Sequence, residues 1–237
     1  MKVSQRSTAD VVAMGRRIVG HFKHSQVAYS CLEDVQRELG MPIKRLQQDV
    51  VTRWNSTYYM MQSLVEQKRT LGAYAADFEL PATLTANQWG ILENMITLLA
   101  PFEQLTREIS SAEASAAGVI PAVVALTQLL SRPSDTDRGV QTAKRTLLEA
   151  ISKRFNGVQR EALFSVATML DARYKDRYFD LEEKSSVRDL LLKVLNEMDS
   201  SGDGGTGNPP EKKTRTGSLL DVYDEILEEN MVFEWQA

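Results

Sequence analysis

Apolar residues recur every three to four positions along most of the chain, which is the spacing of amphipathic helices. The first such stretch runs from Asp10 to Leu39 with one slip in phase, so it predicts two helices or one bent helix. Another helix is expected beyond Thr52 or Ser56, either of which is a suitable cap, with an inward face that extends to Tyr74. The pattern is that of a predominantly α-helical protein.

Helical spacing continues in the second half of the chain. Thr85 is a candidate N-cap for a helix that reaches Ile109, and Pro101 is expected to kink this helix rather than end it, because the spacing continues past it. Four more helices are expected, each separated from the next by a short polar or Gly/Pro break. They are Val119–Leu130, Val140–Phe155, Glu161–Leu170 and Leu181–Met198.

One segment departs from helical spacing. Gly40 and Pro42 interrupt the pattern, and residues 43–51 include a short run that ends in two adjacent valines. Gly and Pro mark turns, whereas β-branched residues favour extended backbone. This segment is the one plausible strand in the chain.

The last forty residues differ in composition from the rest. Residues 199–217 have no hydrophobic residue to anchor them and are expected to form a disordered linker. Residues 218–237 carry an apolar stripe on an acidic background, and we expect an amphipathic helix that docks either on its own domain or on a partner. The stripe consists of Leu219, Leu220, Val222, Tyr223, Ile226, Leu227 and Met231.

The net charge of -4 is unevenly distributed. Residues 1–77 hold 11 Lys and Arg against 7 Asp and Glu, a net of +4, so residues 78–237 carry a net of -8. Any nucleic-acid contact is therefore expected in the first third. Cys31 is the single cysteine, which excludes an internal disulfide, and the polar N-terminus has no apolar run of signal-peptide length. A cytosolic or nuclear location is expected.

Residues 49–61 read Asp-Val-Val-Thr-Arg-Trp-Asn-Ser-Thr-Tyr-Tyr-Met-Met and place an Arg-Trp pair at the start of a helix. This stretch resembles the Arg-Trp block of hAT-superfamily transposases, and in particular of their domesticated relatives, the zinc finger BED domain-containing proteins. Residues 18–25, 99–106 and 169–175 resemble further elements of that family in the same order, with Ala172 where proline is usual.

The resemblance implies a mainly α fold: a partial ribonuclease-H-like core, with late helices and one short strand, joined to the all-helical hAT insertion domain. Residues 1–77 would be the late part of the core with the Arg-Trp block, 78–198 the helical insertion, 199–217 the linker and 218–237 the acidic helix. In this family two metal-binding aspartates precede this region, the third acidic residue follows it, and the zinc-binding BED finger lies far upstream. We therefore expect no catalytic residues, no metal and no cofactor in this chain.

The function implied by the resemblance is that of a non-catalytic, transposase-derived nuclear protein. Its complete form would bind DNA, regulate transcription or chromatin, and be able to form homo-oligomers through a C-terminal dimerisation region. No membrane and no small-molecule substrate are expected. Two alternatives stay open: a segment of an active hAT DNA transposase, and a helical protein-interaction module without a nucleic-acid role.

The candidate DNA-binding residues follow from the block and from the basic first third. The resemblance implies that Trp54 contacts DNA, where an indole can stack on an unpaired base; the alternative is that Trp54 packs at the helix start. Arg53 suits a clamp on phosphate or carboxylate. Five further basic residues would line a groove along the DNA backbone, or else form a solvated face: Arg16, Arg17, Lys23, Lys44 and Arg45.

Two other groups of residues are of types that bind metals or catalyse hydrolysis. His21 and His24, with Cys31 nearby, have a metal-ligand spacing, but no fourth ligand is evident and a half-buried histidine pair is preferred. Four carboxylates suit a nuclease in type, yet the family's catalytic positions do not map onto them, and ion pairing to Arg53 or Arg173 is preferred. They are Asp49, Asp171, Asp176 and Asp180.

Overall fold

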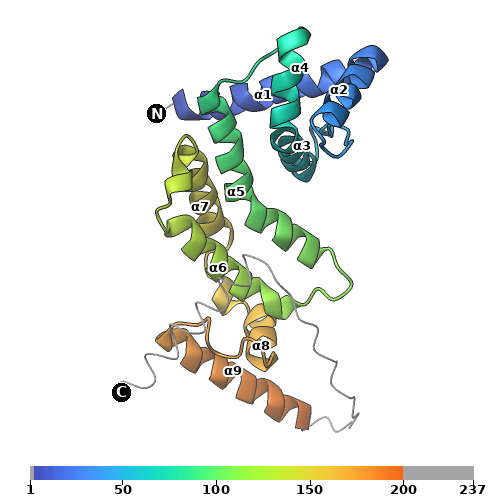
Figure 1. Ribbon diagram of the computed structural model, residues 1–237. Coiled ribbons are helices and arrows are strands. Elements are labelled where there is room, and N and C mark those ends of the chain that lie inside the picture. The colour runs from blue at the N-terminus through green and yellow to red at the C-terminus, as the bar shows by residue number, and fades with distance from the viewer. Residues whose placement is uncertain (1–2, 200–237) are drawn as a thin grey trace. The chain divides into compact units, whose positions relative to one another are not determined.

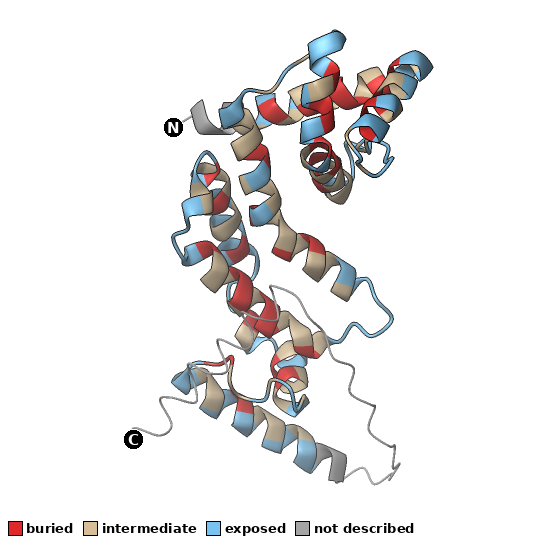
Figure 2. Ribbon diagram, in the orientation of Figure 1, coloured by how far each residue is buried: buried red, intermediate tan, exposed pale blue. Residues whose placement is uncertain are grey.

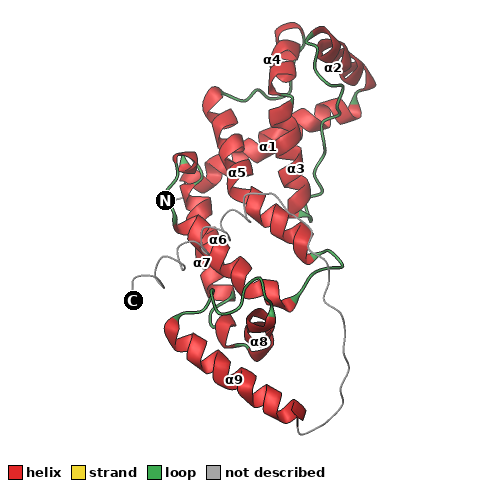
Figure 3. Ribbon diagram, turned by 60° about the horizontal axis from the view of Figure 1, so that its bottom comes forward, coloured by secondary structure: helices red, strands yellow, loops and turns green. Residues whose placement is uncertain are grey.

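The computed structural model describes residues 3–199, and side chains from residue 8 to residue 196. This part of the chain forms nine α-helices and three short 3-10 helices and contains no β-strand (Figures 1 and 3). The predicted mainly helical class is confirmed. The predicted linker begins at Asp199, the last residue of α9, and otherwise lies outside the described residues, as does the predicted helix at 218–237.

The helix bounds follow the predicted hydrophobic spacing closely. Helices expected in the second half of the chain are all present, with ends within one or two residues of the expected ones. The helices are α1 (Val3–His24), α2 (Gln26–Glu38), α3 (Trp54–Glu66), α4 (Lys68–Asp77), α5 (Ala86–Ile109), α6 (Val119–Ser131), α7 (Gln141–Arg154), α8 (Ala162–Leu170) and α9 (Leu181–Asp199). No described helix combines the length and apolar character needed to cross a bilayer.

The chain divides into two compact units. Unit 1 consists of Met1–Glu103 and Pro133–Thr146, and unit 2 consists of Gln104–Arg132 and Leu147–Ala237. This division falls inside α5. The division into a core part and an insertion after residue 77 stays a prediction.

The core of unit 1 forms where α1 packs on α2 and α3, and α2 packs on α4. Its buried residues lie on the facing sides of these helices (Figure 2). Gly15 permits close packing of α1 on α3, since a Cβ there would lie 2.8 Å from the Leu64 Cδ1. The largest completely buried apolar side chains of this core are Val11, Ile18, Val19, Leu32, Met60, Met61, Leu64 and Leu92.

The ends of the unit 1 helices show which sequence signals were correct. Gly40 has a φ of 64° and ends α2, with the Met41 N–H donating to the Gln36 carbonyl, as in a Schellman motif. Thr85 and Gln88 cap α5 reciprocally, which confirms the Thr85 prediction, and α5 continues through Pro101. The prediction that Thr52 or Ser56 caps α3 was wrong, because the N-cap residue is Arg53.

The short strand predicted within residues 43–51 is not formed. This segment is a loop, and the described residues include no strand to pair with it. Side chains from the flanking helices satisfy its backbone instead: Gln36 donates to the Lys44 carbonyl at 2.9 Å, and the Gln47 N–H donates to the Ser63 hydroxyl at 3.0 Å. Adjacent valines favour extended backbone but cannot supply a pairing partner.

The core of unit 2 forms around α8, which packs on α6, α9 and the 3-10 turn Ala116–Gly118. Thr168 is completely buried, and its hydroxyl lies 3.0 Å from the carbonyl of Ala117. Asp180 accepts from the Glu183 N–H at 2.9 Å and so caps α9. The packing of α8 thus joins α6, α8 and α9 within unit 2.

Candidate nucleic-acid interface

A buried carboxylate holds the loop that precedes α3. The Asp49 side chain is only 4% exposed, and its Oδ2 accepts from the Arg16 guanidinium at 2.8 Å and from the Thr57 hydroxyl at 3.0 Å. Arg16 lies on α1 and Thr57 on α3, so the loop is tied to both helices. A buried carboxylate is stable only when its charge and lone pairs are satisfied, and these two donors satisfy it.

A second set of hydrogen bonds fixes the backbone immediately before the Arg-Trp pair. The Ser56 hydroxyl accepts from the Val50 N–H at 2.7 Å and lies 2.6 Å from the Arg53 carbonyl. The Arg53 N–H donates to the Val50 carbonyl at 2.7 Å. The turn from residue 50 to residue 53 is therefore closed by bonds at both ends, which fixes where the Arg53 and Trp54 side chains begin.

Arg53 and Trp54 are both accessible on unit 1. Trp54 keeps 42% of its surface exposed although it is the first residue of α3. Arg53 is exposed and forms no ion pair within the part of the chain that the structure describes. A guanidinium and an indole are therefore presented side by side in sequence, on a turn that is anchored to the core.

The other five predicted DNA-binding residues fall into two groups. Arg16 is occupied by Asp49, Lys44 pairs with Glu66 at 3.2 Å, and the Arg45 guanidinium lies 4.4 Å from the centre of the Tyr29 ring. Arg17 and Lys23 are exposed on α1 and have no ion-pair partner among the described residues. Of the five, Arg17 and Lys23 are the ones whose charge is not engaged by another described side chain.

His21 belongs to an aromatic cluster. Its ring packs edge to face on Phe22 and Tyr74, and its Nε2 lies 3.4 Å from the Tyr74 hydroxyl. Burial, and secondarily the Cys31 thiol, raises the pKa of Tyr74. His24 is exposed, so the expected half-buried arrangement is found for one histidine only. No group of three potential metal ligands exists among the described residues.

The four carboxylates whose residue type would suit a nuclease all have structural partners. Asp171 pairs with Arg173 at 2.6 Å, as predicted, and the hydrogen bond from this guanidinium lowers the pKa of Asp171 against the opposing effect of burial. Asp176 pairs with Arg188 at 3.0 Å. The predicted pairing of Asp49 with Arg53 was wrong, since the partner is Arg16.

Comparison with known proteins agrees with this helical arrangement. Residues 3–98 match the family model of the ZBED1 RNase-like helical domain. The chain is 29% identical over 200 residues to human zinc finger BED domain-containing protein 4, a match that covers 84% of the chain and 17% of that protein. It is 28% identical over 218 residues to mouse zinc finger BED domain-containing protein 6, covering 83% of the chain and 21% of that protein.

The first part of the chain is thus similar to an RNase-like helical domain. Over most of its length the chain is similar to zinc finger BED domain-containing proteins, and this similarity supports a BED-type, hAT-derived protein. It spans about a fifth of the length of the curated relatives it matches. No solved structure matches it.

The sequence did not predict that Thr57 donates to Asp49 or that Asp49 pairs with Arg16. Arg16 and Asp49 are 33 positions apart, and no local pattern links them. The only sequence signal is a carboxylate between Gln48 and Val50, four positions before Arg53. That signal identifies a residue with a structural requirement but does not identify its partner.

Proposed function

We propose that Arg53 and Trp54, together with Arg17 and Lys23 of α1, contact DNA, and that the protein is a non-catalytic, domesticated hAT transposase-like nuclear protein that regulates transcription or chromatin. The observation that carries the proposal is the exposed Trp54 ring next to an exposed Arg53 without an ion-pair partner among the described residues. The resemblance of residues 49–61 to the family's Arg-Trp block supports DNA as the ligand.

The chemistry of these side chains suits a nucleic acid. An indole stacks on any base face, which contributes about 1 to 3 kcal/mol per base, and a guanidinium fits a phosphate with two parallel hydrogen bonds. No side chain caps the first turn of α3, and the positive end of the helix dipole there favours an anion. The buried Asp49 pair keeps the turn in place before DNA arrives, so little ordering entropy opposes binding.

Trp54→Ala tests the proposal when compared with Phe78→Ala. Both side chains are aromatic, lie in unit 1 and are 42% exposed, so the two substitutions remove similar exposed rings. Binding to a single-stranded and a double-stranded oligonucleotide is measured at several salt concentrations. We expect Trp54→Ala to weaken single-strand binding by about 5- to 150-fold, equivalent to about 1 to 3 kcal/mol, and Phe78→Ala to leave it unchanged.

Two outcomes would count against the proposal. If the unmodified protein shows no salt-dependent retention on either DNA, the alternative of a helical protein-interaction module is favoured. If Trp54→Ala lowers only the stability of the fold, Trp54 is a packing residue. Circular dichroism of both variants separates a loss of stability from a loss of contact.

A further inference from the structure

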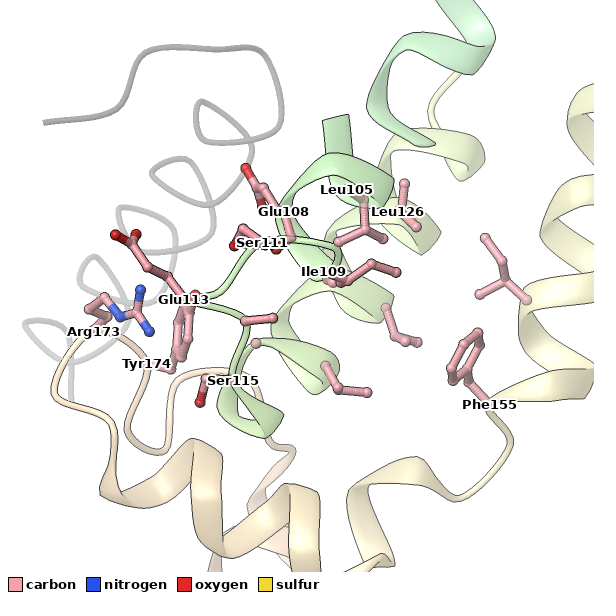
Figure 4. A pocket seen from close by; sticks show the side chains of 16 residues that line it. Leu105, Glu108, Ile109, Ser111, Glu113, Ser115, Leu126, Phe155, Arg173 and Tyr174 are labelled. Atoms are coloured by element: carbon pink, nitrogen blue, oxygen red, sulfur yellow. Dashed lines mark hydrogen bonds between the residues drawn. The ribbon is translucent and has the colours of Figure 1, made fainter. Parts of the chain in front are cut away.

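Unit 2 contains an apolar cavity of about 250 Å³ that the proposed DNA contact does not use. It lies between the end of α5, one face of α6 and the end of α7 (Figure 4). Leu105, Ile109 and Leu126 line it from α5 and α6, and Phe155 follows α7. The volume would hold one or two large apolar side chains.

The cavity is open to an incoming apolar group. Ile109 at its edge is 62% exposed and Phe155 is also exposed, although exposed large apolar side chains gathered at one place are costly in water. Polar side chains gather at the opposite end from Phe155, where Glu113, Arg173 and Tyr174 lie (Figure 4). The site thus offers an apolar pocket with a polar margin, which is the usual form of a pocket that binds an amphipathic helix.

We propose that the C-terminal segment 218–237 of this same chain docks its apolar stripe on this cavity. The segment carries Leu219, Tyr223 and Ile226 at helical spacing, so one helical face would present three large side chains to it. In such a helix four of its acidic residues would fall on the opposite face: Asp221, Asp224, Glu225 and Glu228. An amphipathic segment of this composition requires an apolar surface, and the cavity supplies one.

Exposed basic residues near the ends of the cavity offer partners to an acidic segment. Segment 218–237 contains six Asp and Glu and no Lys or Arg. The cavity lining contains Glu108 and Glu113 as well as Arg173, and Arg173 already pairs with Asp171. Three exposed basic residues lie within two positions of its aromatic lining residues in sequence: Lys153, Arg154 and Lys175. An acidic helix edge beside these cations gains attraction at the margin, where charges remain hydrated and ordering costs are small.

The length of chain between the last described helix and the segment permits the docking. Residues 200–217 join α9, which packs on α8 in unit 2, to the segment. Fully extended, this stretch spans about 60 Å, which exceeds the diameter of a unit of this size, about 35 Å. Because the tether keeps the segment near the cavity at an effective concentration on the order of millimolar, even weak contacts suffice.

Hydrogen exchange of the full chain tests the docking. Ile109→Glu places a carboxylate at the cavity edge facing an acidic segment, whereas Leu163→Glu changes an equally exposed leucine, 69% exposed, on α8 of the same unit outside the cavity. We expect amides of residues 219–231 to exchange at least tenfold more slowly than a free chain in the unmodified protein and in Leu163→Glu. In Ile109→Glu they should exchange at the rate of a free chain.

Controls distinguish a loss of docking from a loss of folding. Peptides from α8, read in the same experiment, report whether unit 2 stays folded; if Ile109→Glu unfolds it, Phe155→Ser, another exposed edge residue, replaces it. Unprotected amides at 219–231 in the unmodified protein, or protection that survives both edge substitutions, would overturn the proposal. Protection that disappears on dilution would assign the cavity to the segment of a second copy and would overturn docking within one chain.

Discussion

The Arg-Trp surface of unit 1 and the cavity of unit 2 are built in opposite ways. In unit 1 an exposed aromatic ring stands on a turn that polar side chains hold, with a buried carboxylate at its centre. In unit 2 apolar side chains surround an unfilled volume, and charges lie at its margin. The first arrangement suits a charged ligand that needs a fixed position, and the second suits an apolar ligand that fills space. The two regions therefore suit two different kinds of ligand.

Truncating one leucine in each region should have the largest effect and should differ between them. Leu64 is completely buried in the unit 1 core, so Leu64→Ala is expected to cost about 2 to 5 kcal/mol of local stability. Leu126 already borders a cavity, so its side chain has fewer contacts to lose on truncation. Leu126→Ala is therefore expected to cost about 2 kcal/mol of local stability, the low end of the same range. Native-state hydrogen exchange of α3 and α6 measures both. Equal losses would mean that the cavity is filled as densely as the core.

Breaking the buried ion pair should have the next largest effect. Asp49→Ala leaves the Arg16 guanidinium and the Thr57 hydroxyl without their acceptor, and we expect a loss of about 1 to 3 kcal/mol in the free energy of unfolding. Arg16 is partly hydrated, which keeps the cost below that of a fully buried pair. Asp49→Asn retains an oxygen acceptor and should lose less. Chemical denaturation measures stability; if the two variants were equally stable, the charge rather than the acceptor would be the important feature.

Neutralising the unpaired cations should change salt dependence more than stability. Each phosphate contact removed lowers the slope of log affinity against log salt by about 0.9 for duplex DNA, so Arg17→Gln and Lys23→Gln should each lower it by about one. Arg69→Gln, an exposed arginine of α4 outside the proposed surface, is the matched control. A slope that falls equally in all three variants would indicate general attraction to a basic unit rather than a defined surface.

The Asp171–Arg173 ion pair at the cavity margin should give the smallest effect, which is a pH dependence in the stability of unit 2. The hydrogen bond from Arg173 lowers the pKa of Asp171, so folding is stabilised above the unfolded value, about 3.9. This contribution is lost as the pH falls through the lower folded value. The difference in unfolding free energy between wild type and Asp171→Asn is expected to stay within about 1 kcal/mol at neutral pH and to shrink below about pH 4. A difference independent of pH would assign the effect to packing.

The sequence by itself determined the helices. Helical hydrogen bonds join residues four positions apart, so periodicity within a short window was sufficient to predict α6 and α9 to within one residue at each end. Turn signals were equally local: Gly40 ended α2 and Thr85 capped α5, as expected. The Arg-Trp block also identified its family, because its motif is a run of adjacent residues.

Only the tertiary structure decided what the charged and extended residues do. The segment 43–51 had the composition of a strand, but a strand exists only beside another, and helical side chains bonded its backbone instead. Arg16 had the sequence context of a DNA contact, yet packing of α1 against the loop brought it to Asp49. The unit 2 cavity likewise forms where the end of α5 and one face of α6 meet Ile151 and Phe155, which come later in the chain. Contacts of this kind depend on which helices meet, and no local pattern encodes that.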